Sequence, residues 1–384
     1  MRALRIILPL ILLIILFWLG LWWYAQSQLV ASVHRAEAKL RETGWTITHG
    51  PITRGSSPLV AQAIVPNLVI MPPGAPGTRP TISFPRVTTR INFNAPFTVA
   101  LDFPHHFAIS APGGSQISVK ADVFTFDYRL DPNALLQSAP DPLRAASTRI
   151  THLQASVGGS NFPIFTIGAV TSHLANDPHA DDQDTALKID ETIKNIAVSP
   201  IFVTLAGLPF GGQIKQIRFK LTASGPDFPD LFNPATVAPA TTNPNPLAQS
   251  TAQLDAFAAQ LRPWASHGGH GRFALSLVIG PLHAKLRTAF NFDHALQPAG
   301  HGLVHGTGLT AFFTAITAAQ PRFAGAIAAA TTAVTPFMTK APDGHQTLHI
   351  VLAVQHRVLT LNGKPATTLP PITWPPAADA PITH

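Results

Sequence analysis

FALSLVIGPLHAKLRTAFNF, residues 273–292, is the segment that decides the fold of this chain. Apolar residues take every second position from Phe273 to Ile279 and again from Leu282 to Phe292, with Gly280-Pro281 between the two runs. Since successive side chains of a strand point to opposite faces, this period predicts two antiparallel strands joined by a turn. Polar residues fill most of the alternate positions of the second run, so the predicted strand pair has one apolar and one polar face.

Runs with the same alternation occur on both sides of this segment. Each is bounded by Pro, Gly, Asn or Asp, which is typical of antiparallel strands joined by turns. Helical spacing of apolar residues predicts one helix over 247–261, ending at Pro263, and another from 309 that breaks at Pro321. We therefore predict an α+β fold, mostly antiparallel β-sheet with a few covering helices. The other predicted strands are Trp45–Ile47, Leu59–Val65, Val87–Phe93, Ile117–Tyr128, Ile217–Ala223, Leu348–Val354 and Val358–Leu361.

Nine apolar side chains of the central strands form the candidate functional surface. They could line an open groove that holds lipid acyl chains, because an apolar strand face removes hydrocarbon from water. Alternatively, they form the closed core of a sandwich or of a helix-covered sheet, and the outer surface binds other proteins of the cell envelope. The nine residues are Ile217, Phe219, Leu221, Phe273, Leu275, Leu277, Leu286, Phe290 and Phe292.

The N-terminus predicts a membrane anchor. No charged residue occurs between Arg5 and Arg35, and the run Ile6–Tyr24 is nearly all apolar. As a helix this run would be about 28 Å long, close to the thickness of the hydrocarbon core of a bilayer. A signal peptide cleaved after Ala25-Gln26-Ser27 is the alternative, but the apolar run is longer than is usual for one. The residues that mark the anchor and its aromatic end are Ile6, Leu10, Trp18, Trp22, Trp23 and Tyr24.

The charges that flank the apolar run predict its orientation. Arg2 and Arg5 lie directly beside it, whereas the cations beyond its other end, which begin at Arg35, are farther away and mixed with acids. The positive-inside rule then leaves the N-terminus in the cytoplasm. We predict a single-pass protein of the bacterial inner membrane, with the bilayer as its partner and the bulk of the chain in the periplasm.

The predicted organisation has six parts. Gly44 ends the helix that continues the apolar run, and a stretch rich in Pro, Thr and Ala separates two β-rich halves. The parts are a cytoplasmic stub (1–5), a transmembrane helix (6–24), an amphipathic helix (25–43), a first β-rich half (44–231), a linker or loop (232–246) and a second α+β half (247–384).

Composition and charge exclude several classes of protein. The 384 residues include no Cys, which excludes thiolate zinc sites, iron–sulfur clusters, Cys nucleophiles and disulfides. The formal net charge is +7, from 26 Lys and Arg and 19 Asp and Glu. Two pairs of cations, Arg218/Lys220 and Lys285/Arg287, predict small positive faces. The cations of the chain are too sparse for a protein that binds nucleic acid. Anionic lipid head groups are the better partner for such faces, and a purely solvated face is the alternative.

The residue types that carry catalysis or bind metals form no recognised motif. The 17 His include no His-Glu-x-x-His pattern, and the acidic run 177–184 departs from a calcium loop at Asp182 and Lys188. The segment 306–311 matches a dinucleotide fingerprint, but no acid follows before Asp343. We predict no catalytic residue, no cofactor and no metal. An envelope hydrolase would instead require Asp102, His105, His106 and the acidic run to converge in one pocket.

The order of several short motifs along the chain resembles a bacterial membrane-anchored family known as domain of unknown function 2125. This family has no established activity, so the resemblance assigns no residue a role. More loosely, the layout is similar to AsmA-like envelope proteins, whose sheets form grooves implicated in lipid traffic, and this is a fold-level analogy. The motifs are the basic start with its apolar span, Gly44-Trp45, Asn94–Phe97, Leu254–Phe257, Asp293–Gly300, Val358–Pro365 and Leu369–Ile372, whereas Arg54–Pro58 departs from the family's Arg-Gly-Phe-Pro turn.

Overall fold

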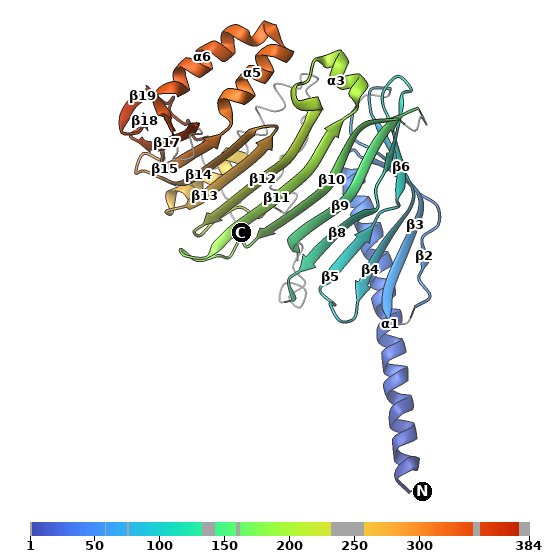
Figure 1. Ribbon diagram of the computed structural model, residues 1–384. Coiled ribbons are helices and arrows are strands. Elements are labelled where there is room, and N and C mark those ends of the chain that lie inside the picture. The colour runs from blue at the N-terminus through green and yellow to red at the C-terminus, as the bar shows by residue number, and fades with distance from the viewer. Residues whose placement is uncertain are drawn as a thin grey trace. The chain divides into compact units, whose positions relative to one another are not determined.

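The computed structural model describes residues 2–57, 59–74, 77–132, 143–158, 162–231, 257–340 and 346–375, and it describes the side chains of the N-terminal helix from Leu16 on, except that of Leu21 (Figure 1). The chain divides into two units, Met1–Leu143 with Thr148–Asn161, and Arg144–Ser147 with Phe162–His384. The linker or loop that the sequence predicts between the two β-rich halves, residues 232–246, lies outside the described residues.

The first unit combines one long helix with antiparallel strands (Figure 1). Its pairings are β1–β3, β2–β3, β3–β4, β4–β5, β4–β6, β5–β8, β6–β7 and β7–β9. The elements are α1 (Arg2–Glu42), β1 (Thr46–Thr48), β2 (Thr53–Arg54), β3 (Val60–Met71), β4 (Thr81–Asn92), β5 (Thr98–Asp102), β6 (His106–Ser110), β7 (Gln116–Lys120), β8 (Val123–Leu130) and β9 (Leu143–Val157).

Helix α1 ends where the sequence predicts, because Gly44 takes a backbone φ of 87° that few other residues adopt. Its second half packs on β3, where Leu29 is buried against Ala61 and Ala63. The buried amide of Gln26 donates a hydrogen bond of 2.8 Å to the carbonyl oxygen of Gly55. The helix is thus fixed to the sheet by both apolar packing and a buried polar contact.

The second unit is an antiparallel meander (Figure 1). Its strands pair in the order β10-β11-β12-β13-β14-β15-β17-β18-β19, and β16 adds a short pairing to β17. The strands are β10 (Pro163–Asn176), β11 (Thr185–Val198), β12 (Gln213–Ser224), β13 (His270–Ile279), β14 (Leu282–Phe292), β15 (Pro298–Thr307), β16 (Met338–Lys340), β17 (Gln346–Gln355), β18 (Val358–Leu361) and β19 (Lys364–Thr368). Its helices are α3 (Pro200–Ala206), α5 (Leu309–Ala319), α6 (Ala324–Val334) and one over 257–266, with 3₁₀ turns η1 (Pro209–Gly212), η2 (Pro321–Phe323) and η3 (Thr335–Phe337).

The prediction of a mostly antiparallel sheet with a few helices is confirmed, and so is the break at Pro321, which separates α5 from α6. The predicted helix end at Pro263 is wrong, because the helix continues to residue 266. An internal proline costs a helix about 3 kcal/mol. Here the continued turn brings Trp264 into the core, where its side chain is 3% exposed and offsets that cost.

Helix α1 is the longest helix of the structure, with 41 residues. Within the part of the chain that the structure describes, no helix has the combination of length and mean hydropathy that crossing a bilayer requires.

Candidate functional site

The pairing of the strands places all nine predicted apolar residues on one face of the second unit's sheet, which we call the apolar face. Residues directly opposite in neighbouring strands share a face. One row across the sheet runs Phe219–Leu275–Leu286, and the row beside it runs Leu221–Phe273. Ile217 lies opposite Leu277, whereas Phe290 and Phe292 extend the same face along β14. Further strands continue it with Ile189, Ile193, Val304, Ile350 and Leu352.

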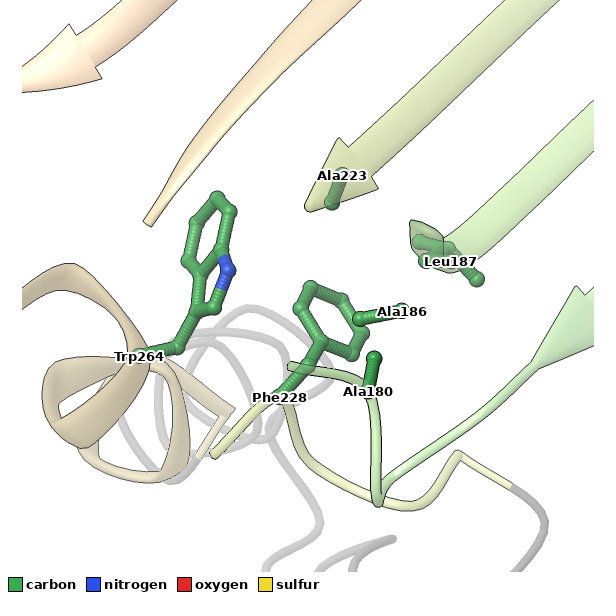
Figure 2. Close-up of a cluster of buried hydrophobic side chains, with 6 residues drawn as sticks. All are labelled: Ala180, Ala186, Leu187, Ala223, Phe228 and Trp264. Atoms are coloured by element: carbon green, nitrogen blue, oxygen red, sulfur yellow. The ribbon is translucent and has the colours of Figure 1, made fainter. Parts of the chain in front are cut away.

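One end of the apolar face is packed. Trp264 lies there with Phe228, and both side chains reach over the ends of β11 and β12 (Figure 2). The indole nitrogen of Trp264 donates a hydrogen bond of 2.9 Å to the carbonyl oxygen of Ser224. Of the nine predicted residues, Leu221, Phe290 and Phe292 pack against this buried cluster. At this end, therefore, the apolar face is a core and not a groove.

Helix α5 covers the opposite end of the same face. It contacts β14 and β17, where Leu282 and Leu348 are buried. The ring of Phe312 in α5 stacks on that of Phe210 in η1, with 5.4 Å between the ring centroids. Between the Trp264 cluster and helix α5 lies a part of the apolar face that we call the middle section.

The middle section carries the other six predicted residues, Ile217, Phe219, Phe273, Leu275, Leu277 and Leu286. All six are half-buried, and among the described residues none belongs to a buried core cluster. Glu191, opposite Phe219, is the carboxylate that interrupts this surface. The middle section is therefore the part of the apolar face that neither the Trp264 cluster nor helix α5 buries.

The opposite side of the same strands is basic, and we call it the basic face. Lys188, Lys194, Arg218, Lys220, Arg272, Lys285 and Arg287 lie on it. In the described parts of β11 to β15 and β17, Asp190 is the one carboxylate on this side. Burial alone would raise the pKa of Asp190, but its contacts with Lys220 (2.9 Å) and Arg218 (3.2 Å) outweigh burial and hold the pKa below its ordinary value.

The basic face is hollowed into a groove of about 560 Å³. Small side chains, Ala274 and Ala289, form its floor, and Leu303 and Val351 lie at one side. Its cations are Lys220, Arg272 and Arg287, with His301 beside them. Lys220 and Arg287 could be singled out from the sequence as cations of positive faces. Arg272 and His301 could not, because only the strand register shows that four different strands bring these residues together.

Three of the residues that an envelope hydrolase would need make ordinary structural contacts. Asp102 is paired with Arg90 at 2.8 Å, and the ring of His105 bonds to the carbonyl oxygen of Ala121. Asp177 accepts a bond from the backbone of His179 in its own turn. In the described ranges, no three His, Asp or Glu side chains are grouped as metal ligands.

The predicted aromatic end of the anchor contacts the first unit. Trp22 donates a hydrogen bond of 2.7 Å to the carbonyl oxygen of Ser57, and the ring of Trp18 lies 4.5 Å from that of Phe93. Trp23 and Tyr24 are exposed, with the guanidinium of Arg54 6.0 Å from the ring of Trp23. Half of this aromatic group thus packs on protein. The side chains of Ile6 and Leu10 lie outside the described ones.

Together these features define a β-rich protein whose sheet has one apolar and one basic face and whose first unit carries a long N-terminal helix. The chain belongs to a bacterial family described as "Uncharacterized protein conserved in bacteria (DUF2125)", whose family model matches residues 22–370. The resemblance to domain of unknown function 2125 is thereby confirmed, whereas the looser similarity to AsmA-like proteins is not shown. No curated protein and no solved structure matches the chain.

Proposed function

We propose that the protein is a non-enzymatic component of the bacterial cell envelope that is anchored in the inner membrane and holds a lipid acyl chain on the middle section of the apolar face. The observation that carries this proposal is the middle section itself, a half-buried apolar surface between two covered ends. A surface of this kind loses free energy when hydrocarbon replaces water, by about 0.8 kcal/mol for each buried methylene.

The dimensions of the surface fit one extended acyl chain. Neighbouring strands lie about 4.8 Å apart, so the rows from β11 to β17 extend over about 24 Å. One leaflet of a bilayer, which a lipid chain crosses, has a hydrocarbon thickness of about 15 Å. The carboxylate of Glu191, at one end of the row that contains Phe219, ends the apolar surface on which such a chain would lie. The analogy with AsmA-like envelope proteins agrees with this proposal at the level of architecture alone.

Photo-crosslinking tests the lipid proposal. The full chain, expressed in bacteria and extracted in mild detergent, is labelled with a photoactivatable fatty acid or phospholipid, and the crosslinked peptides are mapped. We expect crosslinks in β12–β14, and a several-fold loss with Leu277→Gln. Val278→Gln is the matched control, because Val278 is the next residue of the same strand and lies on the basic face. Equal labelling of both variants, or crosslinks confined to α1, would refute the proposal.

The membrane anchor rests on the apolar run Ile6–Tyr24 and on the surface near the end of that run. Leu16, Phe17 and Leu19 of α1 are exposed. Two turns at the same end of the first unit's sheet expose further apolar side chains, Leu59 (67%) before β3 and Phe97 (43%) before β5. Apolar loop tips beside an emerging helix favour contact with lipid.

The anchor has two independent tests. A periplasm-dependent reporter such as alkaline phosphatase, fused behind His384, should be active, whereas activity of a cytosol-dependent reporter alone would refute the orientation. Because the chain holds no cysteine, Leu59→Cys provides a single labelling site. A polarity-sensitive dye at position 59 should shift to the blue when the full chain is reconstituted in vesicles, and the same dye at Ser115, in the β6–β7 turn, should not shift.

A further inference from the structure

Two arginines on the basic face lie side by side without compensation. Arg272 in β13 is opposite Ala289, and Arg287 in β14 is opposite Ala274, so the two are diagonal neighbours. Diagonal positions place their Cβ atoms about 7 Å apart, within reach of long side chains. Both side chains are exposed, and within the described part of the chain neither has a hydrogen bond or an ion pair.

The carboxylate that the described strands place on the basic face is already engaged. Asp190 is shared by Arg218 and Lys220, so the negative charge of this carboxylate is already outweighed by two positive charges. Like charges repel across a sheet, most strongly when they are directly opposite and more weakly at diagonal positions such as those of Arg272 and Arg287. Arg272 and Arg287 therefore add charge to a face on which the described strands β11 to β15 and β17 place one carboxylate, and an anion from solution would reduce this repulsion.

The groove has the shape that an anion with a carbon body needs. Ala274 and Ala289 leave the space between the two arginines open at its floor. On the side away from Lys220, the exposed apolar residues Leu303 (37%) and Val351 (46%) replace the polar residues found elsewhere on this face. Lys220, Arg272 and Arg287 thus line one part of the groove and Leu303 and Val351 another, and nearly all of the surface that they expose to it is apolar.

We propose that this groove binds a phosphate group through Arg272 and Arg287, with the carbon portion of the ligand on Leu303 and Val351. The guanidinium group is planar and presents paired N–H donors that match phosphate oxygens. Lys220 adds a third cation at the edge of the groove. The site lies on the side of the sheet opposite the acyl-chain surface, so the two proposals fail or succeed separately.

Titration calorimetry on the full chain in non-ionic detergent tests the site. The probes are inorganic phosphate and dihexanoyl phosphatidic acid, which is soluble and carries a short apolar body. The double variant Arg272→Gln/Arg287→Gln should lose at least tenfold in affinity. Lys194→Gln/Lys285→Gln removes the same charge from the same face outside the groove, and it should lose less than about threefold. Lysine at both arginine positions should give an intermediate loss, because it keeps the charge but not the fork.

The two probes distinguish the source of the phosphate group. Tighter binding of phosphatidic acid than of phosphate, with the difference abolished by Leu303→Asn, indicates a lipid head group. Equal binding of both indicates a free phosphate and would refute the role given to Leu303 and Val351. If neither probe binds, or if the arginine and lysine double variants lose affinity equally, the proposal is overturned. The Tm of the arginine double variant should be unchanged or raised, and a lower Tm would contradict the repulsion between Arg272 and Arg287.

Discussion

Leu275→Ala separates an open apolar face from a closed core. Leu275 lies at the centre of the middle section, between Phe219 and Leu286, and is half-buried. Removing its three outer carbons would cost about 2.4 kcal/mol if the side chain were fully buried, at ~0.8 kcal/mol for each carbon. Because a minor part of the side chain is in solvent, the expected loss is about 1.5–2 kcal/mol. A closed core would add a cavity and bring the loss to about 2–5 kcal/mol.

Leu187→Ala is the internal reference for this measurement. Leu187 lies on the same face, is 4% exposed and belongs to the packed cluster, so its loss should fall within the range of about 2–5 kcal/mol. Hydrogen exchange of the backbone amides of β11 to β14 measures both losses in the full chain. It reports local free energies of opening, which a chain of two units requires. A loss for Leu275→Ala equal to that for Leu187→Ala would refute the open face.

Three further predictions concern stability. Trp264→Phe keeps a ring in the cluster but leaves the carbonyl oxygen of Ser224 without its donor, which should cost about 1–3 kcal/mol in exchange-derived stability. Gln26→Leu removes the buried bond to Gly55 and should speed the exchange of β3 amides about tenfold or more. The contact of Glu37 with His49 (3.2 Å) should make the attachment of α1 to β1 depend on pH, and exchange of β1 amides, corrected for intrinsic rates, measures it.

The sign of this pH dependence follows from the two pKa values. Burial raises the pKa of Glu37, but the contacts with His49 and Arg41 outweigh it and leave the pKa below the ordinary 4.5. The carbonyl of Gly50, and then Glu37, raise the pKa of His49 above 6.5. The carboxylate stabilises the attachment above pH 4.5 and ceases to do so as pH falls; the imidazolium stabilises it below pH 6.5 and ceases to do so as pH rises through its raised pKa. Protection should be greatest from about pH 4.5 to 6.5.

Each of these three predictions has a clear contrary result. Unchanged exchange in Trp264→Phe would mean that water satisfies Ser224. Normal protection of β3 in Gln26→Leu would mean that the packing of Leu29 alone holds the helix. For the pH dependence, His49→Gln is the control. It should abolish the loss of protection on the alkaline side, and an unchanged profile in that variant would assign the effect to another group.

The alternation of residue types was sufficient to predict β12, β13 and β14 and the two faces of the sheet that they form. It missed the long strands β9, β10 and β11, and the predicted strand Ile117–Tyr128 is wrong, because the structure divides it into β7 and β8. A period of two assigns each side chain to a side whatever strand lies next to it, so Ile217 and Leu277 could be placed on one face without knowing that they are opposite each other. The sequence Asn362-Gly363 is typical of a two-residue hairpin turn, and in the structure both residues take the positive φ that such a turn needs.

Properties that depend on the register could not be predicted in this way. The pairing of Arg272 with Ala289, and hence its place beside Arg287, follows from the length of the turn at Gly280. The continuation of the helix past Pro263 depends on Trp264 meeting Phe228, which comes from a distant segment. Local preference predicts a helix end there, and tertiary packing outweighs it.

The central claim, that the middle section of the apolar face holds an acyl chain, is tested most directly by native mass spectrometry of the full chain released from bacterial membranes. We predict a bound lipid that survives removal of detergent, persists in Val278→Gln and is lost in Leu277→Gln. The bare mass of the protein in all three forms, or a lipid retained equally by all three, would contradict the claim.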